Sequence, residues 1–95
     1  MRQVTLSVDW GQTWPLSEIM WDEEDRPDLP SLLGSELFER LQAWARYFNE
    51  HADLDSASFG GEESRKWFDL EGVALLNLLQ NTVGHLYRFR LKLWF

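Results

Sequence analysis

The chain has 95 residues, a formal net charge of -7 and no cysteine. This length allows one domain with one core, and the lack of cysteine excludes disulfides, thiolate metal sites and a cysteine nucleophile. An acidic chain repels phosphate backbones, and no apolar run approaches the ~20 residues that span a bilayer. We therefore expect a cytoplasmic protein that binds neither nucleic acid nor a membrane.

The first predicted element is a β-strand over residues 3–10. Its apolar side chains occupy every second position, as in a half-buried strand. They are Val4, Leu6, Val8 and Trp10.

Residues 11–34 have no clear periodicity, and residues 16–21 could form a short strand or a turn of helix. Pro27 and Pro30 exclude a continuous helix or a central strand there. The segment also holds a run of four acidic residues, which are Asp22, Glu23, Glu24 and Asp25.

Two amphipathic helices are predicted, over residues 36–52 and 62–81. Ser35 is a suitable N-cap for the first helix. Three- and four-residue spacing defines its apolar face, which comprises Leu37, Phe38, Leu41, Trp44, Ala45, Phe48 and Ala52. The main apolar face of the second helix comprises Trp67, Leu70, Ala74, Leu75, Leu78 and Leu79.

The last predicted element is a strand over residues 86–95. Its apolar face comprises Tyr87, Phe89, Leu91, Leu93 and Phe95. Its other face carries Arg88, Arg90, Lys92 and Trp94.

This order predicts a single α+β domain over residues 1–95, with a β-α-α-β arrangement. A helical hairpin joined by a short loop is most simply antiparallel. The chain then reverses direction an odd number of times between the two terminal strands. We therefore expect these strands to pair antiparallel and to be covered on one face by the helical hairpin. Because a two-stranded sheet is weak alone, a strand from residues 16–21 or a second copy of the chain could widen it. The extra apolar stripe of Val73 and Leu76 favours a homodimer.

Glu71 is the weak candidate for a catalytic residue, because its carboxylate lies within an apolar stripe of the second predicted helix. One interpretation is a general acid or base with a raised pKa. The other is a structural carboxylate that accepts hydrogen bonds from an indole, a backbone N–H or an arginine. Gly72, which follows directly, indicates close backbone packing at this point of the helix.

The sequence predicts no cofactor and no metal. His51, Asp53 and Asp55 have a ligand-like spacing, but metal sites need three or four convergent ligands with a supporting shell. No glycine-rich phosphate loop and no G-x-S-x-G nucleophile motif is present.

Two charged surfaces are candidates for binding a partner. The cationic strand face, defined as Arg88, Arg90, Lys92 and Trp94, could bind an anionic partner or a nucleic-acid strand. The other interpretation is that these residues cover the outer face of the sheet and pair with Asp9 or with the acidic loop. The acidic run over residues 22–25 could engage a basic protein, or could be a solvated loop.

Three local patterns resemble those of small uncharacterised proteins found in actinobacteria and some other bacteria. They are Leu41-Gln42-Ala43-Trp44, the stretch from Trp67 to Glu71-Gly72, and Tyr87-x-Phe89. The resemblance implies that the cluster of Trp67, Glu71 and Gly72 is a feature of that family's fold, and it carries over no activity.

These observations favour a protein–protein interaction module without enzymatic activity. One specific form is an immunity protein or antitoxin that neutralises a basic toxin. The alternative is a small-ligand binder or enzyme that uses Glu71 and a tryptophan-lined pocket.

Overall fold

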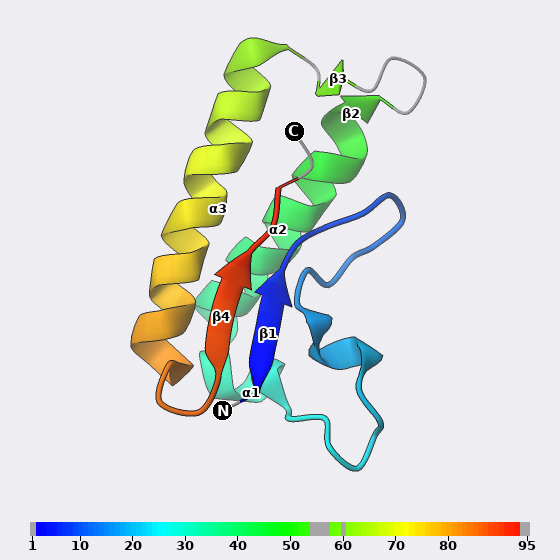
Figure 1. Cartoon of the computed structure of the whole chain (residues 1–95). Coiled ribbons are helices and arrows are strands. Elements are labelled where there is room, and N and C mark those ends of the chain that lie inside the picture. The colour runs from blue at the N-terminus through cyan, green and yellow to red at the C-terminus, as the bar shows by residue number, and fades with distance from the viewer. Residues whose placement is uncertain (1, 54–57, 60, 94–95) are drawn as a thin grey trace.

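The structure is a computed structural model that describes residues 2–53, 58–59 and 61–93. It contains both helices and short strands, which confirms the α+β class (Figure 1). In chain order they are β1 (Gln3–Leu6), the 3-10 helix η1 (Ser17–Met20), α1 (Leu29–Leu33), α2 (Ser35–His51), β2 (Ala52–Asp53), β3 (Ser58–Phe59), α3 (Glu62–Val83) and β4 (Arg88–Leu91).

Helix α2 forms because its apolar residues recur at helical spacing and face the core. Five of them are buried, namely Leu37, Leu41, Trp44, Ala45 and Phe48. The predicted N-cap is wrong, because Ser35 is the first helical residue and Gly34 occupies the cap position. Gly34 has a φ of 87°, a left-handed conformation that glycine adopts at little cost.

Helix α3 buries only part of the apolar face predicted for it, because Leu75 and Leu79 of that face are buried whereas Trp67 and Leu70 are exposed. Its buried residues are Phe68, Gly72, Leu75, Leu79 and Val83. Trp67 is 45% exposed and Leu70 is 63% exposed, so their assignment to the core was wrong. Phe68 takes the inward position by stacking on Trp44, with 4.3 Å between ring centroids, and this rotates the adjacent Trp67 outward.

The two terminal strands pair in parallel, so the antiparallel prediction was wrong. Gln3 lies opposite Arg88 and Leu6 lies opposite Leu91. The prediction missed one chain reversal, because residues 11–28 carry the chain back along β1 before α2 begins (Figure 1). The return is fixed by an antiparallel bridge between Leu6 and Leu16.

No third strand forms from residues 16–21 beyond that bridge, because η1 begins at Ser17. The sheet of β1 and β4 therefore has two strands in the part of the chain that the structure describes. The strand predicted over residues 3–10 is shorter as β1, although Val8 beyond it is buried. Within the same described residues, no helix is long and apolar enough to cross a bilayer.

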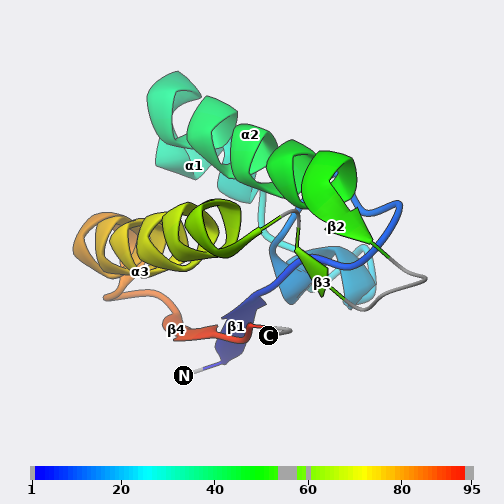
Figure 2. The same ribbon diagram turned by 90° about the horizontal axis from the view of Figure 1, so that it is seen from above.

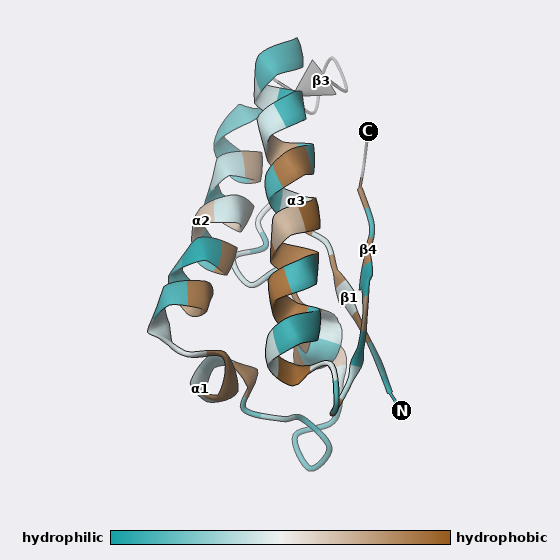
Figure 3. Cartoon of the chain, turned by 90° about the vertical axis from the view of Figure 1, so that its left-hand side faces the viewer, coloured by the Kyte–Doolittle hydropathy of each residue, from teal (hydrophilic) through white to brown (hydrophobic). Residues whose placement is uncertain are grey.

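Both long helices lie on the same face of the sheet, with α3 between α2 and β4 (Figures 2 and 3). The core fills the space between them and the sheet. It includes Val4, Leu6, Val8, Leu16, Leu29, Leu41, Trp44, Phe48, Leu75, Leu79 and Phe89. Residues 11–28 cover the side of this core that α3 leaves open, and this placement positions the site described below.

Candidate functional site

The loop after β1 is tied to helix α2 by the side chain of Asn49. Its amide nitrogen donates to the carbonyl oxygen of Gln12 at 3.0 Å, and its amide oxygen accepts from the backbone N–H of Gly11 at 2.6 Å. The side chain of Gln12 also donates to the carbonyl oxygen of Trp14 at 2.7 Å. These contacts place Trp14 against α2, where its ring lies 5.4 Å from that of Phe38.

The segment that follows is tied to β1. The backbone N–H of Ser7 donates to the carbonyl oxygen of Pro15 at 2.9 Å, and the N–H of Thr5 donates to the hydroxyl oxygen of Ser17 at 2.8 Å. Leu16 is fully buried between these two contacts. The result is that the next residue, Glu18, starts from a fixed backbone position.

Glu18 is a carboxylic acid only 1% exposed to solvent. The indole N–H of Trp14 donates to its Oε1 atom. Its Oε2 atom is buried and has no hydrogen-bond partner within residues 2–53, 58–59 and 61–93. Burial raises the pKa of Glu18 above its ordinary value, while the Trp14 hydrogen bond and the charge of Arg26 oppose that rise.

A hollow of about 450 Å³ opens beside Glu18. Its lining comes from the irregular segment and from α2. The lining residues are Trp14, Glu18, Ile19, Glu23, Arg26, Pro27, Asp28, Pro30, Phe38 and Gln42. We call it the Glu18 hollow. It joins aromatic and proline surfaces to three carboxylates and one guanidinium.

A second hollow of about 340 Å³ lies next to it along α2 and shares Gln42 with it. Its other lining residues are Gly11, Gln12, Thr13, Arg46 and Asn49. The two hollows make this side of α2 a concave surface rather than a flat one.

The acidic run predicted as a partner-binding surface is exposed at all four residues, Asp22, Glu23, Glu24 and Asp25. A backbone hydrogen bond of 2.9 Å from Asp25 to Asp22 folds it into a turn. Arg26, the base that follows, donates to the carbonyl oxygen of Trp21 at 2.9 Å. The run borders the Glu18 hollow through Glu23, so the predicted acidic surface and the hollow are continuous.

The predicted cationic strand face lies on the side of the sheet away from the helices. Arg88, Arg90 and Lys92 are exposed there, and Trp94 lies outside the described residues. No ion pair joins Asp9 to any of these three bases, all of which belong to the described part of β4 and its extension. The pairing with Asp9 considered in the sequence is therefore not formed.

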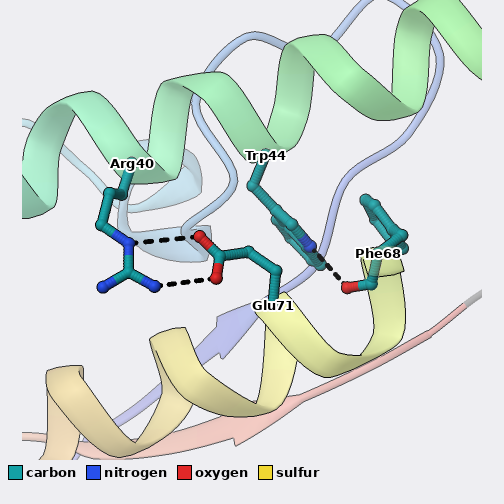
Figure 4. Close-up of polar contacts among 4 residues, drawn as sticks. All are labelled: Arg40, Trp44, Phe68 and Glu71. Carbon is teal, nitrogen blue, oxygen red and sulfur yellow. Dashed lines mark hydrogen bonds and ion pairs between the residues drawn. The ribbon is translucent and has the colours of Figure 1, made fainter. Parts of the chain in front are cut away.

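Glu71 faces Arg40 of helix α2 (Figure 4). The Arg40 guanidinium donates to both carboxylate oxygens, at 2.7 and 3.2 Å. The Glu71 side chain is 18% exposed. This is the structural arrangement that the sequence left open, in which an arginine satisfies the carboxylate.

Gly72 lies where α3 approaches α2 and β4. A methyl group there would lie 3.1 Å from the Trp44 ring and 3.4 Å from Leu91. The Trp44 indole N–H donates to the carbonyl oxygen of Phe68 at 2.9 Å beside it (Figure 4). Close packing thus accounts for a glycine inside this helix.

His51 ends α2, with its Nδ1 atom 2.9 Å from the carbonyl oxygen of Tyr47 and its ring stacked on the Tyr47 ring. Asp55, part of the ligand-like spacing seen in the sequence, lies outside the described residues. Among the described residues, no three histidine, aspartate or glutamate side chains converge as metal ligands do.

Sequence reasoning missed Glu18 and Trp14 as site residues. The available signal was their proximity, four residues apart in the sequence, but no helical turn joins them, since Leu16 forms a β-bridge and η1 begins at Ser17. That signal was hidden in a segment without periodicity. Only the fold shows that Leu16 and Ser17 fix the carboxylate in place.

The geometry defines a small acidic α+β protein with a hollow whose lining carries three carboxylates and one guanidinium. Residues 2–91 match the family described as Serratia CdiI immunity protein-like, so the chain belongs to that family. The comparison with curated proteins found no match. The family match covers all three patterns noted in the sequence.

Proposed function

We propose that the chain is an immunity protein, which binds a toxin and blocks its activity without catalysing a reaction. The observation that carries this proposal is the family match over residues 2–91. Among the interpretations drawn from the sequence, the match favours the immunity protein or antitoxin. The proposal includes a cytoplasmic location, where the lack of cysteine is ordinary.

The surface that we propose for the toxin is the acidic run together with the Glu18 hollow. Exposed charges of one sign around a concave surface attract a partner of the opposite sign and speed association. The acidic run supplies four exposed carboxylates, and the chain as a whole carries a charge of -7. A basic toxin therefore fits this surface, whereas the cationic strand face would repel it.

The geometry does not favour the alternative of an enzyme that uses Glu71. A general base must lie within hydrogen-bond reach of its substrate, and Glu71 lines neither of the two hollows. Both oxygens of the Glu71 carboxylate accept hydrogen bonds from Arg40.

The homodimer stays a prediction. Trp67, Leu70 and Val73 form an exposed apolar stripe on α3, and this stripe could bind a second copy. Light scattering tests it, because a mass of only 11.3 kDa at micromolar concentration would contradict it.

The proposed function predicts a toxin-like protein encoded beside this chain's gene, and it is tested with that protein. We expect co-expression to restore growth and the two proteins to co-purify. Replacing Asp22, Glu23, Glu24 and Asp25 with their amides should lower the association rate about tenfold at low salt, because peripheral charges act mainly on association. The matched control replaces Arg88 and Arg90 with glutamine and should not slow association. An isolated gene, or a toxin that ignores the chain, would count against the proposal.

A further inference from the structure

Glu18 combines deep burial with an incomplete set of hydrogen bonds. The side chain is 1% exposed, and Trp14 satisfies one oxygen while the other has no partner among the described residues. A buried carboxylate without full pairing is unfavourable by several kcal/mol, so such groups are normally paired. The orphaned oxygen is itself closed to solvent, but it belongs to a residue that lines an open hollow, so a donor in the hollow could pair with it once the carboxylate turns toward the opening.

The Glu18 hollow also offers apolar surface against which the hydrocarbon part of a long side chain can pack. Trp14 and Phe38 contact each other at one side of it, and Pro27 and Pro30 line it with further apolar surface. Its volume of about 450 Å³ falls within the range of ligand pockets. Aromatic faces attract cations and stack on planar groups.

The net charge of the residues that line the Glu18 hollow favours a cationic ligand. The lining includes the carboxylates of Glu18, Glu23 and Asp28. Arg26 is the base in the lining, and its guanidinium already donates to the carbonyl oxygen of Trp21. An added guanidinium or ammonium group would therefore meet net negative charge.

We propose that the Glu18 hollow receives an arginine side chain of the partner protein, with the guanidinium paired to the free oxygen of Glu18 and flanked by Trp14 and Phe38. The identity of the partner rests on the proposed function, but the chemistry of the hollow does not. Arginine fits better than lysine, because its planar fork can donate to a carboxylate while its face stacks on an aromatic ring. The competing possibility is that a water molecule, and not an arginine, donates a hydrogen bond to the free oxygen of Glu18.

The first experiment needs no toxin. N-acetyl-arginine methylamide is titrated into the protein, and the Trp14 indole N–H resonance is followed by two-dimensional NMR. N-acetyl-citrulline methylamide is the matched probe, because it has nearly the same shape without the charge. We expect a saturable shift with arginine and at least about fivefold weaker binding with citrulline, since charge-assisted hydrogen bonds are roughly twice as strong as neutral ones. Equal responses, or no response to arginine, would overturn the proposal.

The second experiment uses the toxin and two variants that each remove one negative charge. Glu18→Gln keeps the shape of the side chain inside the hollow. Glu24→Gln is the control, since Glu24 belongs to the acidic run but does not line the hollow. We expect Glu18→Gln to raise the dissociation rate about tenfold, as loss of a buried charge pair does, and Glu24→Gln to change mainly the association rate.

The two proposals fail separately. If the toxin binds tightly and both variants behave alike, the arginine site is wrong and the immunity function stands. If the arginine probe binds and no toxin does, the site stands and the immunity function is wrong.

Discussion

Two glutamates illustrate how differently this fold treats a carboxylate. Glu71 lies between two regular helices, and one arginine satisfies both of its oxygens. Glu18 lies in an irregular segment, and an indole satisfies one of its oxygens. The first arrangement is complete within the chain. The second leaves one oxygen without a hydrogen-bond partner among the described residues, and we propose that a group of a partner protein completes it.

The largest expected effect is the loss of stability when Trp44 is replaced in the helical region. Trp44→Ala removes a fully buried ring that stacks on Phe68 and donates to its carbonyl oxygen. We expect the free energy of unfolding to fall by about 3–5 kcal/mol in a urea titration. The control Trp67→Ala removes the same type of side chain from a position that is 45% exposed. It should lower the free energy of unfolding by no more than about half as much. Equal losses would mean that Trp67, not only Trp44, belongs to the core.

The next effect tests whether Glu71 is structural. Arg40→Ala leaves a partly buried carboxylate without its guanidinium, so we expect a loss of about 1–2 kcal/mol in thermal or urea unfolding. Arg65→Ala is the control, because its pair with Asp69 spans 3.8 Å on an exposed helix face, and it should change stability by about 0.5 kcal/mol or less. A double-mutant cycle with Glu71→Gln that shows no coupling would refute the structural role.

Replacing Glu18 should stabilise the fold at neutral pH, whereas removing the partner of Glu71 should destabilise it. Because burial raises its pKa, the folded state holds the proton more tightly than the unfolded state does. The stability that this proton contributes is complete below pH 4.5 and is lost as the pH rises through the raised pKa. Glu18→Gln cannot titrate, so the variant should gain stability relative to the parent as pH rises above 4.5. Unfolding measured from pH 4 to 8 checks this, and a constant difference across that range would contradict it.

The smallest effect concerns the contact that brings the helices together. Gly72→Ala adds a methyl group 3.1 Å from the Trp44 ring, and also adds a better helix former. These effects oppose each other, so we expect a net loss of less than about 1 kcal/mol. Gly72→Val should lose more, because the two methyl groups on its Cβ must also fit between α2 and β4. A gain with valine would show that the packing is looser than the distances indicate.

The regular elements could be predicted because their side chains repeat. The three- and four-residue spacing of Leu37, Leu41 and Trp44 located α2 to within a residue or two. The same spacing could not decide between the adjacent rings of Trp67 and Phe68, since both are large and apolar. That choice depends on which ring stacks on Trp44 from another helix.

The candidate site could be predicted only in part. The acidic run was visible as a charge pattern, and it borders the hollow. Glu18 was not, because its burial depends on tertiary contacts made by Leu16 and Ser17. The same return of the chain over residues 11–28 hid the parallel pairing of β1 and β4, because a reversal without periodic side chains leaves no local signal.

The parallel pairing also constrains how the protein folds. β1 is made near the start of the chain and β4 near its end, and the crossover between them contains both long helices. Contacts between such distant segments must overcome a large loop-closure entropy and tend to slow folding. During synthesis, β1 cannot form its parallel pair until β4 leaves the ribosome. The sheet is therefore expected to form last, and a nascent chain halted before β4 would remain open to proteases.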